Sequence, residues 1–164
     1  MINTLNKINE KLQNIARYVA VFLLFVIIIS TSVQVFTRYV LDSSLVGTEE
    51  VSRYCFIWAT MLGAAICVSS FSHASVSFVP DMLKGRIKLI NTCIIQALMM
   101  VLAVIFIVQG VKMVGITINQ LSPTLKVPMW LVYSAVPVGG VMILLASLCN
   151  IINSVFCIKP GGVQ

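Results

Sequence analysis

The sequence predicts an all-α membrane protein with four transmembrane helices, preceded by a short amphipathic N-terminal helix. Of its 164 residues, 59% are hydrophobic and 10% are charged, whereas a soluble domain carries about 25% charged residues. The apolar residues form four continuous runs, each close to the ~20 residues that a helix needs to cross a bilayer. Because the runs do not alternate in polarity, helices rather than a β-barrel satisfy the backbone in lipid.

The N-terminal segment, residues 1–17, is predicted to be an amphipathic helix at the membrane interface. Its apolar residues recur at spacings of three and four, and polar residues fill the other face. A frayed polar terminus is the alternative. A signal peptide is not favoured, because the apolar run that follows is too long and no small-residue cleavage site follows it. The apolar positions are Ile2, Leu5, Ile8, Leu12 and Ile15.

Residues 18–160 are predicted to form one transmembrane domain, with spans at about 18–40, 48–72, 88–118 and 127–157. The third span, at ~30 residues and ~45 Å, exceeds the bilayer and must tilt or protrude. Pro128 suits an early position of the fourth helix, whereas Pro137 lies deeper and is expected to kink it.

The distribution of Lys and Arg predicts the orientation of the chain. With an even number of spans, one side carries seven of these residues, including the cluster at 84–88, and the other side carries four. We therefore expect both termini in the cytoplasm. The net charge of +6 is explained by these loops and their contact with lipid headgroups. Since no basic stripe is visible, nucleic-acid binding is not expected.

The cysteines and the single histidine do not predict a metal or redox centre. None of the five cysteines forms a C-x-x-C pair, and all lie in or beside apolar runs, as small buried hydrophobes do. His73 alone cannot supply the several ligands of a haem, copper or zinc site. No cofactor and no enzymatic activity are predicted.

The segment from Arg38 to Trp58 contains the most informative polar residues. Thr48 is expected to cap the second helix, with Glu49 and Glu50 in its first turn, where the helix dipole favours carboxylates. Glu49 and Arg53 are four residues apart and can pair. The carboxylates either bind a proton, an ion or a cationic substrate, or they cap the helix and hold a partner or the neighbouring loop; the second interpretation is favoured. Trp58 is expected in the interfacial aromatic belt, with Tyr54, Trp130 and Tyr133.

The remaining features of the spans are two patches of small residues and a lack of charged residues at the span centres. Gly63-Ala64-Ala65 and Gly139-Gly140 are expected to permit close helix packing. No charged residue lies in the middle of a span, whereas transporter cores usually place polar groups there. The chain therefore looks poorly equipped to move a polar solute alone.

Two blocks of residues between positions 35 and 140 form a recognisable pattern. They are Arg38-Tyr39, Leu45, Glu49-Glu50, Arg53-Tyr54, Phe56-Ile57-Trp58 and Leu62-Gly63-Ala64-Ala65, then Ser122-Pro123, Pro128-Met129, Tyr133, Pro137 and Gly139. In these motifs the chain resembles the small membrane (Q-type) subunit of tripartite ATP-independent periplasmic (TRAP) transporters. One departure is the segment His73-Ala74-Ser75-Val76-Ser77, because the family often has Val-Asp three residues after the histidine and the acidic residue is missing here.

This resemblance implies a non-catalytic scaffold subunit of a sodium-driven importer of organic acids, such as sialic acid or a C4-dicarboxylate, in the bacterial inner membrane. Its implied partners are a large membrane subunit, which carries the substrate and sodium sites, and a periplasmic binding protein. The residues expected at the subunit interface or in a structural role are Arg38, Glu49, Glu50, Arg53, Trp58, Pro123 and Pro128.

Two other functions remain as alternatives. A stand-alone, proton-coupled small multidrug exporter would also have four helices, but it needs a carboxylate inside a span. A membrane redox enzyme would need paired thiols or paired histidines.

Overall fold

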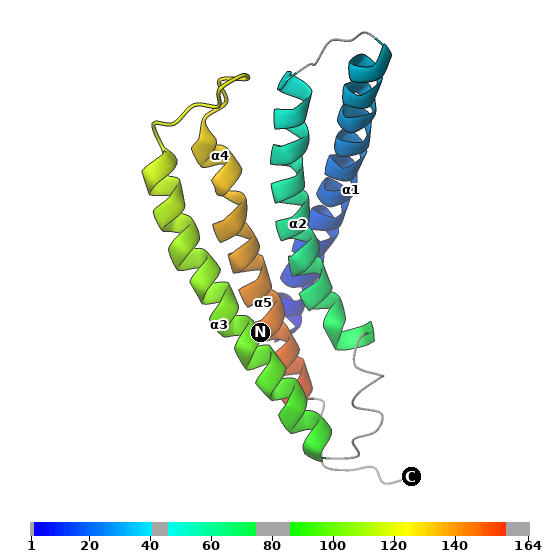
Figure 1. Cartoon of the computed structure of the whole chain (residues 1–164). Coiled ribbons are helices and arrows are strands. Elements are labelled where there is room, and N and C mark those ends of the chain that lie inside the picture. The colour runs from blue at the N-terminus through cyan, green and yellow to red at the C-terminus, as the bar shows by residue number, and fades with distance from the viewer. Residues whose placement is uncertain (1, 41–45, 75–85, 157–164) are drawn as a thin grey trace.

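The computed structural model describes residues 2–40, 46–74 and 86–156 and is helical over nearly all of them. The helices are α1 (Ile2–Val40), α2 (Val46–Ala74), α3 (Arg86–Thr117), α4 (Met129–Tyr133) and α5 (Ala135–Phe156) (Figure 1). Four stretches are long and apolar enough to span a membrane: Asn9–Val40, Gly47–Ser69, Ile94–Thr117 and Met129–Ile152. The predicted all-α membrane fold is confirmed.

The first helix, α1, is one uninterrupted helix of 39 residues, about 58 Å long. It contains no Gly or Pro, so no residue between its amphipathic start and its apolar remainder favours a break. The segment expected at the interface is therefore continuous with the first span. Its position relative to the bilayer stays a prediction.

The fourth span consists of two helices that are interrupted at Ser134. Pro137 lies three residues beyond the break; it has no N–H to donate to the Tyr133 carbonyl, and its ring crowds that carbonyl. Hydrogen bonds on both sides keep the interruption small, from Ser134 N–H to the Trp130 carbonyl at 2.9 Å and from Val138 N–H to the Ser134 carbonyl at 3.2 Å. The disturbance expected from Pro137 occurs here.

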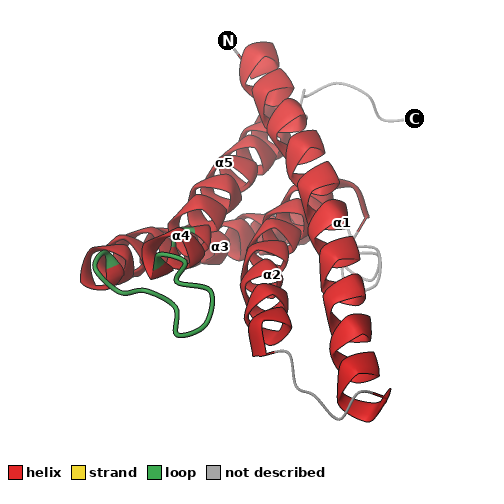
Figure 2. Cartoon of the chain, turned by 90° about the horizontal axis from the view of Figure 1, so that it is seen from above, coloured by secondary structure: helices red, strands yellow, loops and turns green. Residues whose placement is uncertain are grey.

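The helices pack as two pairs that α5 joins. α1 contacts α2, α3 contacts α5, and α5 also contacts α2 and, less extensively, α1. Figure 2 shows the α1–α2 pair beside the pair formed by α3 and α5. Within the described ranges, α3 contacts only α4 and α5. The fourth span is accordingly the most enclosed: 44% of its most apolar stretch is buried, whereas the corresponding share in the other three spans is 6–22%.

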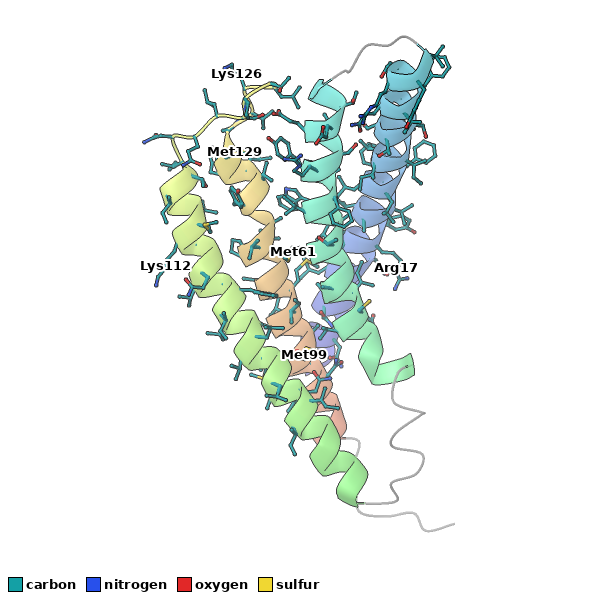
Figure 3. All side chains as sticks on the ribbon, viewed as in Figure 1. Arg17, Met61, Met99, Lys112, Lys126 and Met129 are labelled. Carbon is teal, nitrogen blue, oxygen red and sulfur yellow. The ribbon has the colours of Figure 1, made fainter. Side chains whose placement is uncertain are left out.

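Small residues make the central contacts. Ala65, Ala103 and Ala146 are fully buried. A Cβ atom added to Gly139 would lie 3.0 Å from the Met61 Cβ on α2, and Figure 3 shows Met61 pointing from α2 toward α5. Close backbone approach of this kind replaces the hydrophobic effect as a source of helix association in lipid.

The added Cβ atoms also show which small residues lie at helix contacts. On Gly140 the nearest atoms are Cγ1 of Ile107 at 3.0 Å and the Ala103 carbonyl oxygen at 3.1 Å. Gly139 and Gly140 therefore permit the close packing expected of them. Gly63 is not at a close helix contact, since an added Cβ there meets nothing within 4 Å. Within the patch Gly63-Ala64-Ala65, only Ala65 is buried.

Several sequence predictions lie outside the described residues. These are Lys84 and Gly85 of the basic cluster, the side chains of Arg86 and Lys88, the His73 side chain, and the connection between α1 and α2.

Candidate functional site

Glu50, in the first part of α2, makes polar contacts with a distant part of the chain. Its side chain is buried, with 8% of the residue exposed. The carboxylate accepts a short hydrogen bond from the Ser122 hydroxyl. It also accepts backbone N–H bonds from Thr124 at 3.2 Å and from Leu125 at 3.1 Å. We call Glu50 together with residues 118–128 the Glu50 corner.

The loop over residues 118–128 is shaped to present these donors. Ser122 N–H donates to the Val127 carbonyl at 2.9 Å, and Met129 N–H donates to the Gln120 carbonyl at 2.9 Å, so the loop folds back on itself. Lys126 has φ of 55°, a left-handed conformation that lets the chain reverse. Figure 3 shows Lys126 on this loop above Met129, where α4 begins.

Local physics explains why a carboxylate occupies this position. Three donors from the loop, the Ser122 hydroxyl and the N–H groups of Thr124 and Leu125, point at the Glu50 carboxylate. Hydrogen bonds to an ionised carboxylate are charge-assisted and therefore stronger than those to a neutral acceptor. Figure 2 shows the loop reaching from α3 and α4 toward the start of α2. The corner thus ties the two helix pairs together at one end.

Glu49 points elsewhere and makes a different interaction. Its Oε1 lies 2.7 Å from the Arg53 guanidinium, forming the ion pair that the sequence predicted. The two side chains are 53% and 65% exposed, and ion pairs in such surroundings contribute little to stability. The adjacent glutamates therefore differ: Glu50 binds the loop and Glu49 faces outward.

Of the other predicted site residues, Pro123, Pro128 and Arg38 lie at this end of the molecule, whereas Trp58 lies farther along α2. Pro123 is exposed in the loop, next to Ser122, and Pro128 precedes α4 with φ of −67° and ψ of 124°. Arg38 is exposed in the last turn of α1. Trp58 lies in the middle of the Gly47–Ser69 span rather than near its end, where the aromatic belt was expected, and it is partly buried against the hydrophobic core.

Two sequence predictions at this site are wrong. Thr48 is not the capping residue of α2, since the helix begins two residues earlier at Val46, and for the same reason only Glu49 of the two glutamates lies in the first turn. The sequence also gave no indication that Ser122, Thr124 and Leu125 bind Glu50. The only signal was a Ser-Pro pair in a polar loop, which does not identify a partner 72 residues away.

Comparison with known proteins gives a consistent result. A family model described as the DctQ component of tripartite ATP-independent periplasmic transporters matches residues 27–157. The chain is 28% identical to a TRAP transporter small permease protein of Haemophilus influenzae, over 77% of the chain and 79% of the relative. It is also 28% identical to the sialic acid TRAP transporter small permease protein SiaQ of Vibrio cholerae, over 91% of the chain and 86% of the relative.

A third relative is much longer than this chain. The isethionate TRAP transporter permease protein DctMQ of Oleidesulfovibrio alaskensis is 28% identical over 59% of the chain, and this match covers 16% of that protein.

Proposed function

The chain belongs to the DctQ-component family of TRAP transporters, and we propose that it is the small scaffold subunit of a sodium-driven importer of organic acids. Members of this family are transporter components and not enzymes. Its partner is a large permease subunit, in keeping with the DctMQ relative, of which the similar segment is only a small part. Sialic acid or a C4-dicarboxylate is the proposed substrate class, since one relative is named for sialic acid.

The observation that carries the scaffold proposal is the condition of Glu50. It is the one buried acidic side chain among the described residues, and three donors from its own chain occupy its oxygens. A carboxylate that carries a proton or an ion through the membrane must exchange those partners during each cycle. Glu50 instead fixes a loop to a helix, as a static support requires.

The loop of the Glu50 corner is the proposed contact for the periplasmic binding protein. Leu121 is 60% exposed and Leu125 is 39% exposed, so apolar side chains project from the end of the bundle beside Lys126. Exposed apolar residues with polar neighbours are typical of protein contacts. With both termini in the cytoplasm, as the charge distribution predicts, this end of the bundle lies in the periplasm.

The exporter alternative is not favoured. It requires a carboxylate that is free to exchange protons within a span, whereas Glu50 is bound by Ser122, and Glu49 is paired with Arg53. The similarity to small permease subunits also gives it no support.

Co-purification tests the scaffold proposal at the Glu50 corner. The chain is expressed with the large subunit of its own transporter, and the affinity tag is placed on the large subunit. We expect Glu50→Gln to reduce the amount of small subunit recovered in the complex, because a neutral amide accepts weaker hydrogen bonds from the loop. Glu49→Gln, the adjacent exposed control, should leave recovery unchanged. If wild-type chain does not co-purify with the large subunit at all, the proposed role is wrong.

A further inference from the structure

A second group of polar side chains is buried at the opposite end of the bundle from the Glu50 corner. The end lies where α1 and α3 begin and where α2 and α5 finish (Figure 1). Asn150 is bound there, since its Nδ2 donates to the Val68 carbonyl on α2 at 2.9 Å. Four side chains of this group are at most 5% exposed: Gln13, Gln96, Ser147 and Asn150.

Three atoms in this group have no hydrogen-bond partner in the described part of the chain: Oε1 of Gln13, Oε1 of Gln96 and Oγ of Ser147, all shielded from solvent. Gln13 lies on α1, which does not contact α3 within the described ranges, so Gln96 and Ser147 are the two that the α3–α5 pair can bring together. Two threonine hydroxyls in the helices are satisfied locally: Thr60 and Thr117 donate to carbonyls of their own helices at 2.9 and 2.8 Å. Because Ser147 does not do this, its proton remains available for a partner outside α5.

The helix register turns Gln96 and Ser147 toward each other. Gly140 on α5 packs against Ala103 on α3. Ser147 lies seven residues after Gly140, and Gln96 lies seven residues before Ala103. Since α3 and α5 run in opposite directions, both steps lead the same way along the pair. Seven residues are close to two helical turns, which preserves the facing side of each helix.

Residues on the adjacent side of α5 support this orientation of the helix. Gly139 faces Met61 on α2, and seven residues later Ala146 is fully buried. Asn150, one turn beyond Ala146, binds α2 through the Val68 carbonyl. Gly139, Ala146 and Asn150 therefore form the side of α5 that faces α2, and Ser147 lies on the side that faces α3.

We propose that Gln96 and Ser147 bind a buried water molecule that bridges α3 and α5. The Gln96 oxygen needs a donor, and the Ser147 hydroxyl can donate and accept. A water molecule supplies two donors and two acceptors and satisfies both groups at once, as buried waters commonly do. Both residues lie within candidate spans, where an unpaired polar group is costly because lipid offers no replacement partner.

A bridging water and two unpaired groups predict changes of opposite sign in the thermal unfolding midpoint when either residue is replaced. Thermal unfolding is measured on the purified complex of the chain with its large subunit, for Gln96→Leu, Ser147→Ala and the double variant. With a bridging water, each single change leaves the other partner unsatisfied, and we expect the midpoint to fall by about 2–8 °C. The double variant should then fall by clearly less than the sum of the singles. Thr60→Val, which removes an exposed hydroxyl bound within its own helix, should change the midpoint little.

Three results would overturn the proposal. The first is a rise in the midpoint for either single variant, which would mean that the atom was unpaired and costly. The second is additive losses, which would indicate independent packing effects. The third is an experimental density map of the complex in which Gln96 and Ser147 bond directly or no water lies within hydrogen-bond reach of both. Water density contacting both atoms would support the bridge.

Discussion

Replacing Gly110 by alanine is expected to force α3 and α5 apart. A Cβ atom at this position would lie 2.6 Å from Cδ of Pro137, 2.9 Å from its nitrogen and 3.3 Å from its Cα. Carbon atoms in contact are normally about 3.5–4.0 Å apart, so the helices must separate locally by about 1 Å. The neighbouring atoms belong to the ring and backbone of Pro137, so no side-chain rotation can relieve the overlap.

The size of the effect follows from two opposing contributions. Overpacking of a tight contact costs about 1–3 kcal/mol. Alanine in place of glycine returns up to about 1 kcal/mol through its greater helix propensity. Gly115 provides a matched control on the same helix, because an added Cβ there meets nothing within 4 Å. Gly115→Ala therefore keeps only the favourable contribution, and the two variants should differ by about 2 kcal/mol.

The assay is the thermal unfolding of both variants in the same detergent and with the same large subunit. At about 2–4 °C per kcal/mol for a chain of this size, Gly110→Ala should unfold about 4–8 °C below Gly115→Ala. Equal midpoints for the two variants would show that α3 and α5 do not approach each other at Gly110 and Pro137.

Three further predictions address other contacts. Gly140→Ala should lower the unfolding midpoint by several degrees, because the added Cβ would lie 3.0–3.2 Å from Ile107 and the Ala103 carbonyl, whereas Gly63→Ala should not; equal effects would contradict the packing described. Asn150→Leu should cost about 1–2 kcal/mol in thermal unfolding by removing the bond to Val68, and an unchanged midpoint would argue against that bond. Ser122→Ala should speed tryptic cleavage after Lys126 by loosening the loop from Glu50, while Glu49→Gln should not; identical cleavage rates would contradict the role of the Glu50 corner.

The helices were predictable because each depends on a local property of the sequence. Four apolar runs indicate four spans wherever they pack, and Pro137 disturbs the fourth through its own missing N–H. The Glu49–Arg53 pair is likewise local, since residues four apart lie on one face of a helix. The error at Thr48 was a displacement of two residues at a helix start, where boundaries are least determined by sequence.

The sequence favoured a structural role for the two glutamates, but it could not predict that Glu50 rather than Glu49 binds a loop, or which donors it binds, because these depend on tertiary packing. The polar and apolar residues of α2 do not separate onto two faces, so no amphipathic pattern distinguishes an inward Glu50 from an outward Glu49. Ser122 is 72 residues away, in the loop between α3 and α4, so its contact with Glu50 depends on how the two helix pairs are arranged. The packing of small residues shows the same limit: Gly63 and Gly139 look alike in sequence, but only Gly139 faces a neighbouring helix.

Uptake into liposomes tests the scaffold role most directly. The large subunit is reconstituted with and without this chain, the binding protein is loaded with radiolabelled sialic acid or succinate, and an inward sodium gradient is imposed. We expect transport to require both membrane subunits and to fall markedly when the chain is omitted. Transport at the full rate by the large subunit and the binding protein alone would contradict the proposed scaffold function.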